Sequence, residues 1–504
     1  MPEYILTLDL GTSACKASLF ALDGEHRGEA VAQAAVEYPT VHPEPGWAEQ
    51  DPETWWDAAA TGVRRLPQEM RRRVAALGLS SHRGGVVPMD GAGRALGRCI
   101  IWMDRRSTRE LQAFVATFGR EKVHRVTGLV PDTEFTASKL LWLRTHAPDL
   151  FQAARLYLQP RDFLYVRLTG SPATDYTLAS RTMLMDIARR AWWTDAFAYV
   201  GITPDVFPPV HPSAAAPHRV SREAAGLLDI PAGIPVALGA GDRPCEVLGA
   251  GAGGGRVMMS TGTTTNVSAA VPQIPAEWDL RVMCSLHAVE SEVLLEQGMS
   301  ASGAILRWMR DRLLGGRMDY RRLDELAGNA APGADGPLFL PFMMGARATR
   351  WDPEARGVWF GLSEAHTLGA LARSVMEGVA FEARACLDLL EGLGVRPTEV
   401  IAVGGGARSS LWNQIFADVL DRPVGVPRQI DAASVGAMLL AGAAIGHFTE
   451  TERTAQAVNP VRDVFRPGTA AAQAYRARYA AYNRLYEALR PLFRDLAARE
   501  KQEE

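Results

Sequence analysis

The chain contains 504 residues, and its 54 Lys and Arg nearly balance its 57 Asp and Glu, giving a formal net charge of −3. This length predicts roughly two to four domains. A hydrophobic content of 47% is too high for a disordered chain. The near-neutral charge excludes a strongly basic surface, so we expect no nucleic-acid partner. The five cysteines form no C-x-x-C pair, which excludes a zinc ribbon and a disulfide framework.

Neither a signal peptide nor a membrane anchor is predicted. Glu3 and Asp9 interrupt the region where an apolar leader would lie. The apolar stretch at residues 432–446, which carries no charged side chain, is shorter than the roughly 20 residues of a membrane-spanning helix. We therefore expect a soluble cytoplasmic protein with no membrane partner.

Apolar runs alternate with polar turns in the first eighty residues, as is typical of strands. The strands predicted from these runs are residues 4–10, 16–22, a third run ending at residue 36, and 75–79. A helix is predicted from Pro52, because Asp51 can cap it and proline suits a first turn. Residues 107–168 are predicted to be mostly helical.

The second half repeats this plan. Its predicted strands are residues 235–240, 256–260, 265–271, 290–296 and 400–403. Helices are predicted from residue 302, over 411–420 and over the last thirty residues, where tyrosines recur every three or four positions on one face that we expect to dock onto the core. A strand meander followed by alternating helices and strands, occurring twice, predicts two similar α/β domains with a cleft between them.

Three turns of small residues follow strands at matching places, at residues 9–13, 260–265 and 404–409. Glycine lets a backbone approach a ligand closely, and hydroxyls with successive N–H groups can hold phosphate oxygens. Each turn alone is equally typical of a plain hairpin or connector. Together they predict a nucleotide-binding cleft. A G-x-G-x-x-G match at residues 249–254 is interpreted as accidental, because a helix is predicted before it and a strand after it.

Motifs along the whole chain resemble those of the FGGY carbohydrate kinases, and most closely those of the xylulokinases. They are residues 8–13 with Lys16, 47–52 with Trp55 and Trp56, 139–143, 261–263, 340–342, 356–362, 371–373, 377–378 and 404–409. The resemblance implies an α/β fold of two actin-like ATPase (ribonuclease H-like) domains with an inter-domain cleft. Residues 1–244 would form the sugar-binding side, and residues 245–504 the ATP-binding side.

The resemblance also implies roles for individual residues. Asp242 would be the catalytic base that takes the proton of a substrate hydroxyl as it attacks the γ-phosphoryl group of ATP; its position also suits a helix N-cap. Asp9 and Asp242 would hold Mg²⁺. The implied ATP-binding residues are Gly11, Thr12, Ser13, Lys16, Thr261, Gly262, Thr263, Gly405, Gly406, Ala407 and Asn413.

The implied substrate-binding residues are His82, Arg83, Gly84, Trp102, Asp104, Asp242 and Arg243. Trp102 and Asp104 match the Trp-x-Asp of the xylulokinases, whereas the loop at residues 82–85 and Arg243 depart from the family pattern. Xylulokinases have Gln-Met-His-Gly where this chain has His82-Arg83-Gly84-Gly85, and glycerol kinases have the arginine followed by a glutamate. Gly84 would leave room for a substrate larger than glycerol. Arg243 could join His82 and Arg83 in binding an acidic sugar, or could pair with a neighbouring carboxylate. Trp102 could stack on the sugar or pack in the core.

The resemblance thus predicts ATP- and Mg²⁺-dependent phosphorylation of a ketose or polyol, most like D-xylulose to D-xylulose 5-phosphate. The alternatives are a kinase of another polyol or of an acidic sugar, and a non-catalytic nucleotide- or sugar-binding regulator on the same fold. The expected partner is a small sugar or polyol, and homodimerisation is left open. Closure of the cleft is expected, because phosphoryl transfer must exclude water.

Overall fold

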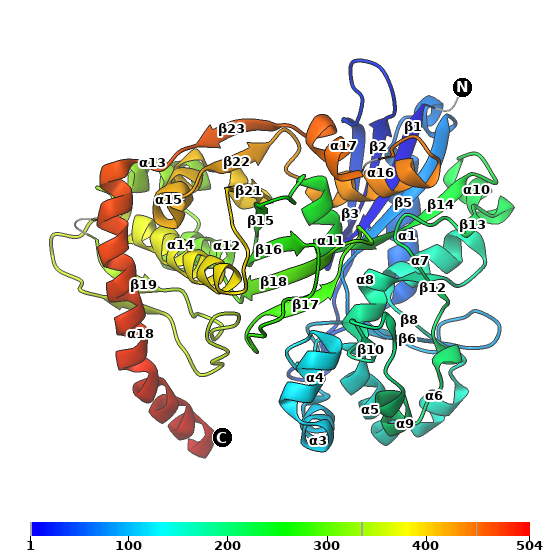
Figure 1. The fold of residues 1–504 in the computed structure, drawn as a ribbon, viewed down its shortest axis with the longest axis horizontal. Helices are drawn as coiled ribbons and strands as arrows, with labels where there is room; N and C mark the ends of the chain where they lie inside the picture. The colour runs from blue at the N-terminus through cyan, green and yellow to red at the C-terminus, as the bar shows by residue number, and fades with distance from the viewer. Residues whose placement is uncertain (1–2, 334–335, 450, 504) are drawn as a thin grey trace.

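The computed structural model describes residues 3–333, 336–449 and 451–503, so the outer limits of the expected domains, 1 and 504, lie outside it. Its framework is two β-sheets (Figure 1). Across the six-stranded sheet the order is β13 (His218–Arg219), β14 (Pro235–Gly241), β5 (Val74–Ser81), β1 (Tyr4–Leu10), β2 (Ala14–Ala21) and β3 (Ala30–Glu37). Across the seven-stranded sheet it is β17 (Met283–Leu286), β18 (Val293–Met299), β16 (Thr265–Val271), β15 (Arg256–Thr261), β21 (Glu399–Val403), β22 (Val424–Pro427) and β23 (Val461–Phe465).

Both sheets contain the predicted meander. β1 pairs antiparallel with β2 and parallel with β5, and β15 pairs in the same way with β16 and β21. The last strand of the second meander, β18, is Val293–Met299 rather than residues 290–296. The short strand β17, which pairs with β18, was not predicted, because its four residues do not stand out as a periodic run. The α/β class is confirmed.

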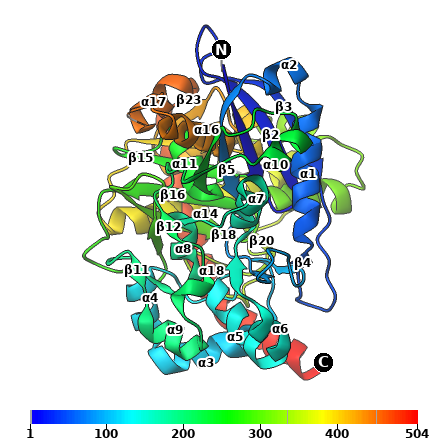
Figure 2. The ribbon, with the colours of Figure 1, turned by 90° about the vertical axis from the view of Figure 1, so that its right-hand side faces the viewer.

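Two helices from distant parts of the chain cover opposite faces of the first sheet (Figure 2). α1 (Pro52–Arg65) begins as predicted after Asp51, whose side chain accepts the N–H of Glu53 at 3.0 Å. α16 (Ala432–Ala444) covers the other face, although it comes from the second half of the sequence. The N-terminal half (residues 3–249) and the C-terminal half (residues 256–503) are therefore interlocked.

Helix α11 (Asp242–Gly249) packs on α16 and joins the halves, so the expected boundary between residues 244 and 245 falls inside a helix. A Cβ on Gly249 would lie 1.9 Å from the carbonyl oxygen of Ala432, and one on Gly436 would lie 2.1 Å from that of Cys245. Only glycine permits so close a crossing. α11 precedes the G-x-G-x-x-G match and β15 follows it, so the order required for dinucleotide binding is absent, as predicted.

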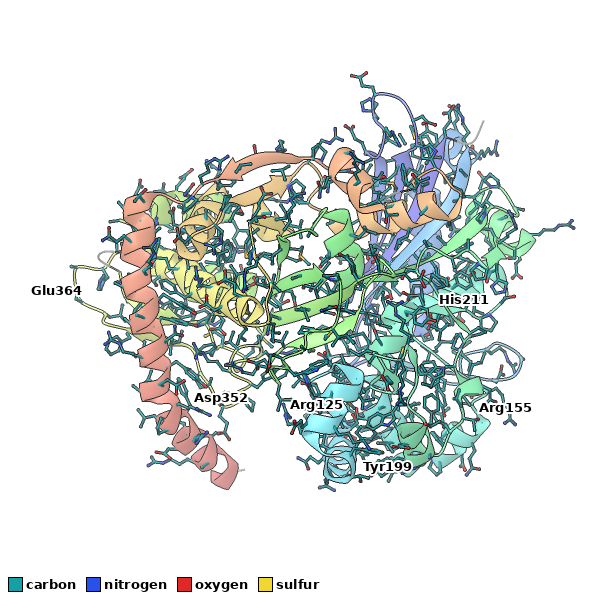
Figure 3. The ribbon with its side chains drawn as sticks, viewed as in Figure 1. Arg125, Arg155, Tyr199, His211, Asp352 and Glu364 are labelled. Atoms are coloured by element: carbon teal, nitrogen blue, oxygen red, sulfur yellow. The ribbon has the colours of Figure 1, made fainter. Side chains whose placement is uncertain are left out.

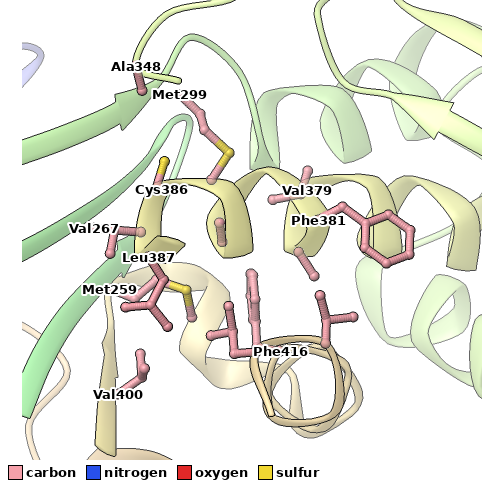
Figure 4. Close-up of a cluster of buried hydrophobic side chains, with 14 of the residues drawn as sticks. Met259, Val267, Met299, Ala348, Val379, Phe381, Cys386, Leu387, Val400 and Phe416 are labelled. Atoms are coloured by element: carbon pink, nitrogen blue, oxygen red, sulfur yellow. The ribbon is translucent and has the colours of Figure 1, made fainter. Parts of the chain in front are cut away.

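The core of the C-terminal half surrounds the long helix α14 (Leu368–Gly392). Figure 4 shows its Val379, Cys386 and Leu387 in one buried cluster with Val400 of β21 and Phe416 of α15 (Ser410–Leu420). The C-terminal helix α18 (Thr469–Glu503) docks on this core through its tyrosines, as predicted. The hydroxyls of Tyr475 and Tyr482 donate to carboxylates of α14 at 2.6 and 2.8 Å, and that of Tyr486 donates to Asp352, labelled in Figure 3, at 2.7 Å.

A helical lobe completes the N-terminal half, as the sequence predicted. Its helices are α3 (Thr108–Phe118), α4 (Arg120–Thr127), α5 (Thr136–His146), α6 (Pro148–Ala153), α7 (Pro160–Thr169), α8 (Tyr176–Ala179) and α9 (Thr194–Val200), with β8 (Leu156–Leu158) between α6 and α7. The remaining helices of the C-terminal half include α12 (Gly303–Trp308), α13 (Tyr320–Gly328) and α17 (Thr451–Val458). Among the described residues, no helix has the length and apolar character needed to cross a membrane.

Candidate active site

Two cavities lie along the predicted cleft. The inter-half cavity, of about 640 Å³, is lined by side chains of both halves. Of the residues that the sequence predicted for a site, it includes Thr12, Ser13, His82, Arg83, Gly84, Trp102, Asp242, Arg243 and Thr263. The glycine-loop cavity, of about 560 Å³, is lined by the C-terminal half, including Gly262, Gly405 and Gly406. Thr263 lines both cavities, so they meet at the turn between β15 and β16.

The first turn, between β1 and β2, borders the inter-half cavity through Thr12 and Ser13. Gly11 lies behind them, where its carbonyl oxygen accepts the hydroxyl of Tyr38. The hydroxyl of Thr12 accepts the indole N–H of Trp102 at 3.0 Å. Ser13 is exposed. The turn thus offers the hydroxyl of Ser13 to a ligand, while Gly11 and Thr12 are engaged within the protein.

Asp9 and Lys16 face each other across β1 and β2, beside a residue that the sequence did not single out. That residue is Asp431, which lies directly before α16. Its carboxylate accepts a hydrogen bond from Lys16 Nζ at 2.6 Å. Burial, with the nearby Asp431 charge, raises the pKa of Asp9 to about 7. An aspartate before a helix has the sequence signature of a cap, so only the fold reveals that Asp431 reaches Lys16.

These carboxylates suit a magnesium ion that is bound partly by phosphates and water, rather than a metal ion held by protein side chains alone. The negative charges of Asp431 and Asp242 both raise the pKa of Asp9, so added positive charge would be stabilising there. The described part of the chain contains no cluster of three or more His, Cys, Asp or Glu able to hold a metal. Mg²⁺ usually takes one or two carboxylates, with phosphates and water as its other ligands. Asp9 and Asp242 match that requirement.

Asp242 is the first residue of α11, at the end of β14. Its carboxylate is about one-third exposed, at 33%, and lines the inter-half cavity. Oδ1 accepts Arg83 Nε at 3.2 Å and the backbone N–H of Arg243 at 2.8 Å. Both contacts use Oδ1, so Oδ2 is the oxygen available to a ligand. The residue in the N-cap position is Gly241, not Asp242.

Arg83 connects Asp242 to a glutamate that the sequence analysis missed. Its Nη1 and Nη2 donate to the two carboxylate oxygens of Glu296, on β18, at 2.9 and 2.7 Å. Although burial opposes it, Arg83 and Arg181 hold the pKa of Glu296 well below its usual range. The signal in the sequence is a charge within the apolar strand Val-Leu-Leu-Glu, since a buried carboxylate needs a partner.

Glu134 forms a second bridge between the halves. Its carboxylate accepts Arg181 of the N-terminal half and Arg347 of the C-terminal half, both at 2.8 Å. Burial alone would raise the pKa of Glu134, but Arg347 and Arg181 lower it to about 2. The structure thus brings Glu134 and Arg347, which lie 213 positions apart in the sequence, together across the interface.

His82 is the one predicted substrate residue that is buried without a hydrogen-bond partner on either ring nitrogen. Only 2% of it is exposed, yet it lines the inter-half cavity, with Trp55 edge-on to its ring. Burial lowers its pKa to about 4, so the ring is neutral at neutral pH. A neutral imidazole with two unused nitrogens can both donate to and accept from sugar hydroxyls.

Gly84 does not open the cavity in the way that the sequence suggested. Its φ is +80°, and an added Cβ would lie 2.3 Å from the carbonyl oxygen of Glu134 rather than in free space. The same loop is held by Lys139, whose buried ammonium donates to the carbonyl oxygens of Gly84, Thr133 and Glu134 at 2.7–2.9 Å. Burial lowers the pKa of Lys139 to about 7. Gly84 and Lys139 shape the loop that carries Arg83.

Trp102 and Asp104 have different positions. Trp102 lines the inter-half cavity. Asp104 is fully buried and does not line it, because its carboxylate binds Arg106 at 2.7 Å and accepts the backbone N–H of Ala48 at 2.6 Å. A hydrogen bond from a sugar hydroxyl to Asp104 therefore does not fit this structure. Arg243 borders the cavity, but it pairs with Glu246 one turn further along α11. Of the two alternatives for Arg243, this is pairing with a neighbouring carboxylate.

In the glycine-loop cavity, the residues predicted to bind ATP fall into two groups. Gly262, Thr263, Gly405 and Gly406 line it. Thr261, Ala407 and Asn413 are buried behind them, where the Asn413 side chain donates to the Ala407 carbonyl oxygen at 2.8 Å. The lining also includes Ser409 of the predicted turn at residues 404–409, and side chains that the sequence did not predict, among them Arg307, Tyr320, Arg321, Asp324 and Trp412. Several of them lie on α12 and α13, far in sequence from the turns.

Two family models match most of the chain. The N-terminal domain of the FGGY family of carbohydrate kinases matches residues 4–249, and the C-terminal domain matches residues 257–445. The chain is 31% identical to a xylulose kinase of Escherichia coli (strain K12), over 96% of this chain and 99% of that protein.

Relatives with other substrates are nearly as similar. A glycerol kinase of Thermococcus gammatolerans is 30% identical, with 93% and 94% of the two chains covered. A gluconokinase of Bacillus licheniformis is 28% identical, with 87% of each covered. The crystal structure of a xylulose kinase from Rhodospirillum rubrum matches with a TM-score of 0.87 at 30% identity. The match covers 97% of this chain and 100% of that chain. The protein belongs to the FGGY family of carbohydrate kinases.

Proposed function

We propose that the protein transfers the γ-phosphoryl group of ATP to a hydroxyl of a neutral ketose or polyol, and that D-xylulose, converted to D-xylulose 5-phosphate, is its substrate. The observation that carries this proposal is the position of Asp242. Its carboxylate is open to the inter-half cavity, and that cavity meets the glycine-loop cavity at Thr263. A sugar in the first cavity and a nucleotide in the second would present hydroxyl and phosphate to each other there.

In this mechanism Asp242 Oδ2 accepts the proton of the attacking hydroxyl, while Arg83 fixes Oδ1. His82 and Trp102 border the space for the sugar and would orient it through hydroxyl hydrogen bonds and ring contact. The backbone of Gly262, Gly405 and Gly406 gives the nucleotide a close-fitting surface. Mg²⁺ held near Asp9 and Asp242 would neutralise charge on the phosphates.

The pairing of the arginines favours a neutral sugar over an acidic one. The terminal nitrogens of Arg83 are bonded to Glu296, and Arg181 and Arg347 share Glu134. Arg243 is paired with Glu246. A substrate carboxylate would compete with these protein carboxylates for the same guanidinium groups, and weakening a buried pair such as Arg83–Glu296 is costly. Each of these four arginines thus already has a carboxylate partner in the protein.

A non-catalytic regulator remains the alternative from another class. A binder has no need for an exposed carboxylate in the inter-half cavity, whereas a kinase requires one as base. The position of Asp242 therefore favours catalysis.

A coupled assay of ADP release tests the proposal directly. The purified protein is incubated with ATP, Mg²⁺ and one sugar at a time, drawn from pentuloses, hexuloses, polyols and aldonates. We expect D-xylulose to raise the rate far above the sugar-free rate. The proposal fails if no sugar raises it. Sugar binding measured by calorimetry without any ADP release would support the regulator.

A further inference from the structure

We propose that Glu296 is a positioning residue for phosphoryl transfer, which holds Arg83, and through Arg83 the base Asp242, across the interface between the two halves. This inference rests on the proposed function, because it takes Asp242 as the base. It gives a catalytic reason for the buried Arg83–Glu296 ion pair, whose glutamate lies outside all of the sequence motifs.

The carboxylate of Glu296 is fixed rather than free to turn to a ligand. It is 4% exposed and lies in the middle of β18. Oε1 accepts Arg83 Nη1 at 2.9 Å and the hydroxyl of Ser285 at 2.8 Å, and Oε2 accepts Arg83 Nη2 at 2.7 Å. A second guanidinium, that of Arg181, lies 3.8 Å away. Both oxygens are therefore occupied by protein donors.

Fixing Arg83 also fixes the direction of its third donor. The guanidinium is a rigid, planar fork, so binding Nη1 and Nη2 to one carboxylate sets where Nε points. Nε donates to Asp242 Oδ1 at 3.2 Å. The stem of Arg83 passes directly over Gly241, where a Cβ would lie 2.2 Å from Arg83 Cδ. The backbone before Asp242 and the side chain that orients it are thus packed as one unit.

Glu296 also prevents Arg83 from neutralising the base. A buried guanidinium without another carboxylate would turn its terminal N–H groups toward Asp242 and pair with both oxygens. In this structure Glu296 takes those groups, so Arg83 reaches only Oδ1 and leaves Oδ2 available for a proton. The role assigned to Glu296 is therefore to keep the base both aligned and accessible.

The pair crosses between the two sheets. Arg83 follows β5 of the first sheet, and Glu296 belongs to β18 of the second. Moving the sheets apart would break the bidentate contact and release Arg83 to Asp242. The alignment of the base would then depend on closure of the inter-half cavity, so chemistry would be favoured only when water is excluded.

An ordinary interface ion pair is the competing explanation, and the chain offers a second inter-half pair as a control. Arg428 of the C-terminal half pairs with Glu29 of the N-terminal half at a more exposed position, and neither lines the inter-half cavity or the glycine-loop cavity. If Glu296 only holds the halves together, Glu296→Gln and Glu29→Gln should both affect stability and leave the rate of the bound complex unchanged.

The test compares Glu296→Gln, Glu296→Asp and Glu29→Gln in the full chain, with the sugar that the wild type turns over. We expect Glu296→Gln to lower kcat at least about tenfold while KM for ATP stays within about twofold, because only the reacting groups are misplaced. Glu296→Asp should restore part of kcat, and Glu29→Gln should keep it. A wild-type kcat in Glu296→Gln would overturn the inference. If that variant does not fold, a wild-type kcat in Glu296→Asp would overturn it equally, and a reduced kcat at unchanged KM for ATP would support it.

A crystal structure of Glu296→Gln tests the positioning without any turnover. We expect the terminal nitrogens of Arg83 to move to Asp242 and engage both of its oxygens. An unchanged single contact from Nε to Oδ1 would contradict the inference. A wild type that phosphorylates no sugar would instead defeat the proposed function, while the crystal structure would still decide whether Glu296 positions Asp242.

Discussion

The two cavities that meet at Thr263 are built in different ways. The inter-half cavity is lined by charged side chains from both halves, and those of Arg83, Glu134 and Glu296 form ion pairs across the interface. The glycine-loop cavity is lined by one half, and its lining includes the backbone of Gly262, Gly405 and Gly406. On the proposed function, recognition of the sugar in the first cavity would depend on side chains that must be paired correctly. Recognition of the nucleotide in the second would depend in part on a backbone surface with no room for an added Cβ at certain positions.

The largest effect should come from the base, and it should separate the two cavities. Asp242→Asn keeps the shape of the side chain but removes its ability to accept a proton. We expect kcat to fall about a thousandfold, within the range typical of a general base. Because the glycine-loop cavity is untouched, the affinity for ADP measured by calorimetry should remain within a factor of about two. Full activity in this variant would contradict the role of Asp242.

The loop that carries Arg83 can be tested by adding a Cβ to Gly84, where it would clash, and to Gly93, where it would not. Gly84 and Gly93 have φ of +80° and +78°, but only a Cβ on Gly84 would meet another group, at 2.3 Å. We expect Gly84→Ala to lower the free energy of unfolding by about 3 kcal/mol and to raise KM for the sugar. Gly93→Ala should cost about 1 kcal/mol, from its backbone conformation alone. Urea denaturation and steady-state kinetics provide both values; equal losses would show that the close approach at Gly84 is unimportant.

The nucleotide side can be tested with two adjacent glycines. A Cβ on Gly406 would lie 2.5 Å from Thr261 Cγ2, whereas none of the described atoms lies within 4 Å of one on Gly405. We expect Gly406→Ala to lower the free energy of unfolding by about 1–2 kcal/mol and to raise KM for ATP without changing KM for the sugar. In urea denaturation, Gly405→Ala should leave stability nearly unchanged. A larger effect on sugar than on ATP would contradict the division between the cavities.

The smallest expected effect is on pH dependence, through two buried histidines. Burial lowers the pKa of both His82 and His287 from 6.5 to about 4, so as pH falls the unfolded chain takes up these protons first. Each therefore reduces stability as pH falls from 6.5 toward 4. Replacing either by Gln should remove about 1 kcal/mol of the loss in unfolding free energy between about pH 7 and pH 5.5. Only His82→Gln should also change KM for the sugar, because His287 does not line the inter-half cavity. An unchanged pH dependence in both variants would contradict the lowered pKa values.

Local patterns predicted the framework of the fold. Strand β1 begins and ends where its apolar run does, and α1 begins after Asp51, because these signals lie within a few neighbouring residues. The repeated meander predicted that the turns at residues 11–13 and 261–263 occupy equivalent places in the two halves. In the structure, both turns border a cavity.

Contacts between distant segments were not predictable from such patterns. Glu296 meets Arg83 across 213 positions, and Asp431 meets Lys16 across 415. Helix α16 is apolar nearly all round, a pattern that predicts burial but not which sheet it covers. Asp104 was expected at the sugar because of its place in a motif, yet Arg106, two residues away, holds it in the interior. Such partners become visible only when the chain is folded.

The ratio of kcat/KM for D-xylulose to that for D-gluconate tests the central claim most directly. D-gluconate carries a carboxylate, and each arginine of the inter-half cavity named above already has a carboxylate partner in the protein. We predict that D-xylulose is preferred by at least about a hundredfold, because the acid would compete with the protein's own carboxylates for these arginines. An equal or greater kcat/KM for D-gluconate would contradict the account.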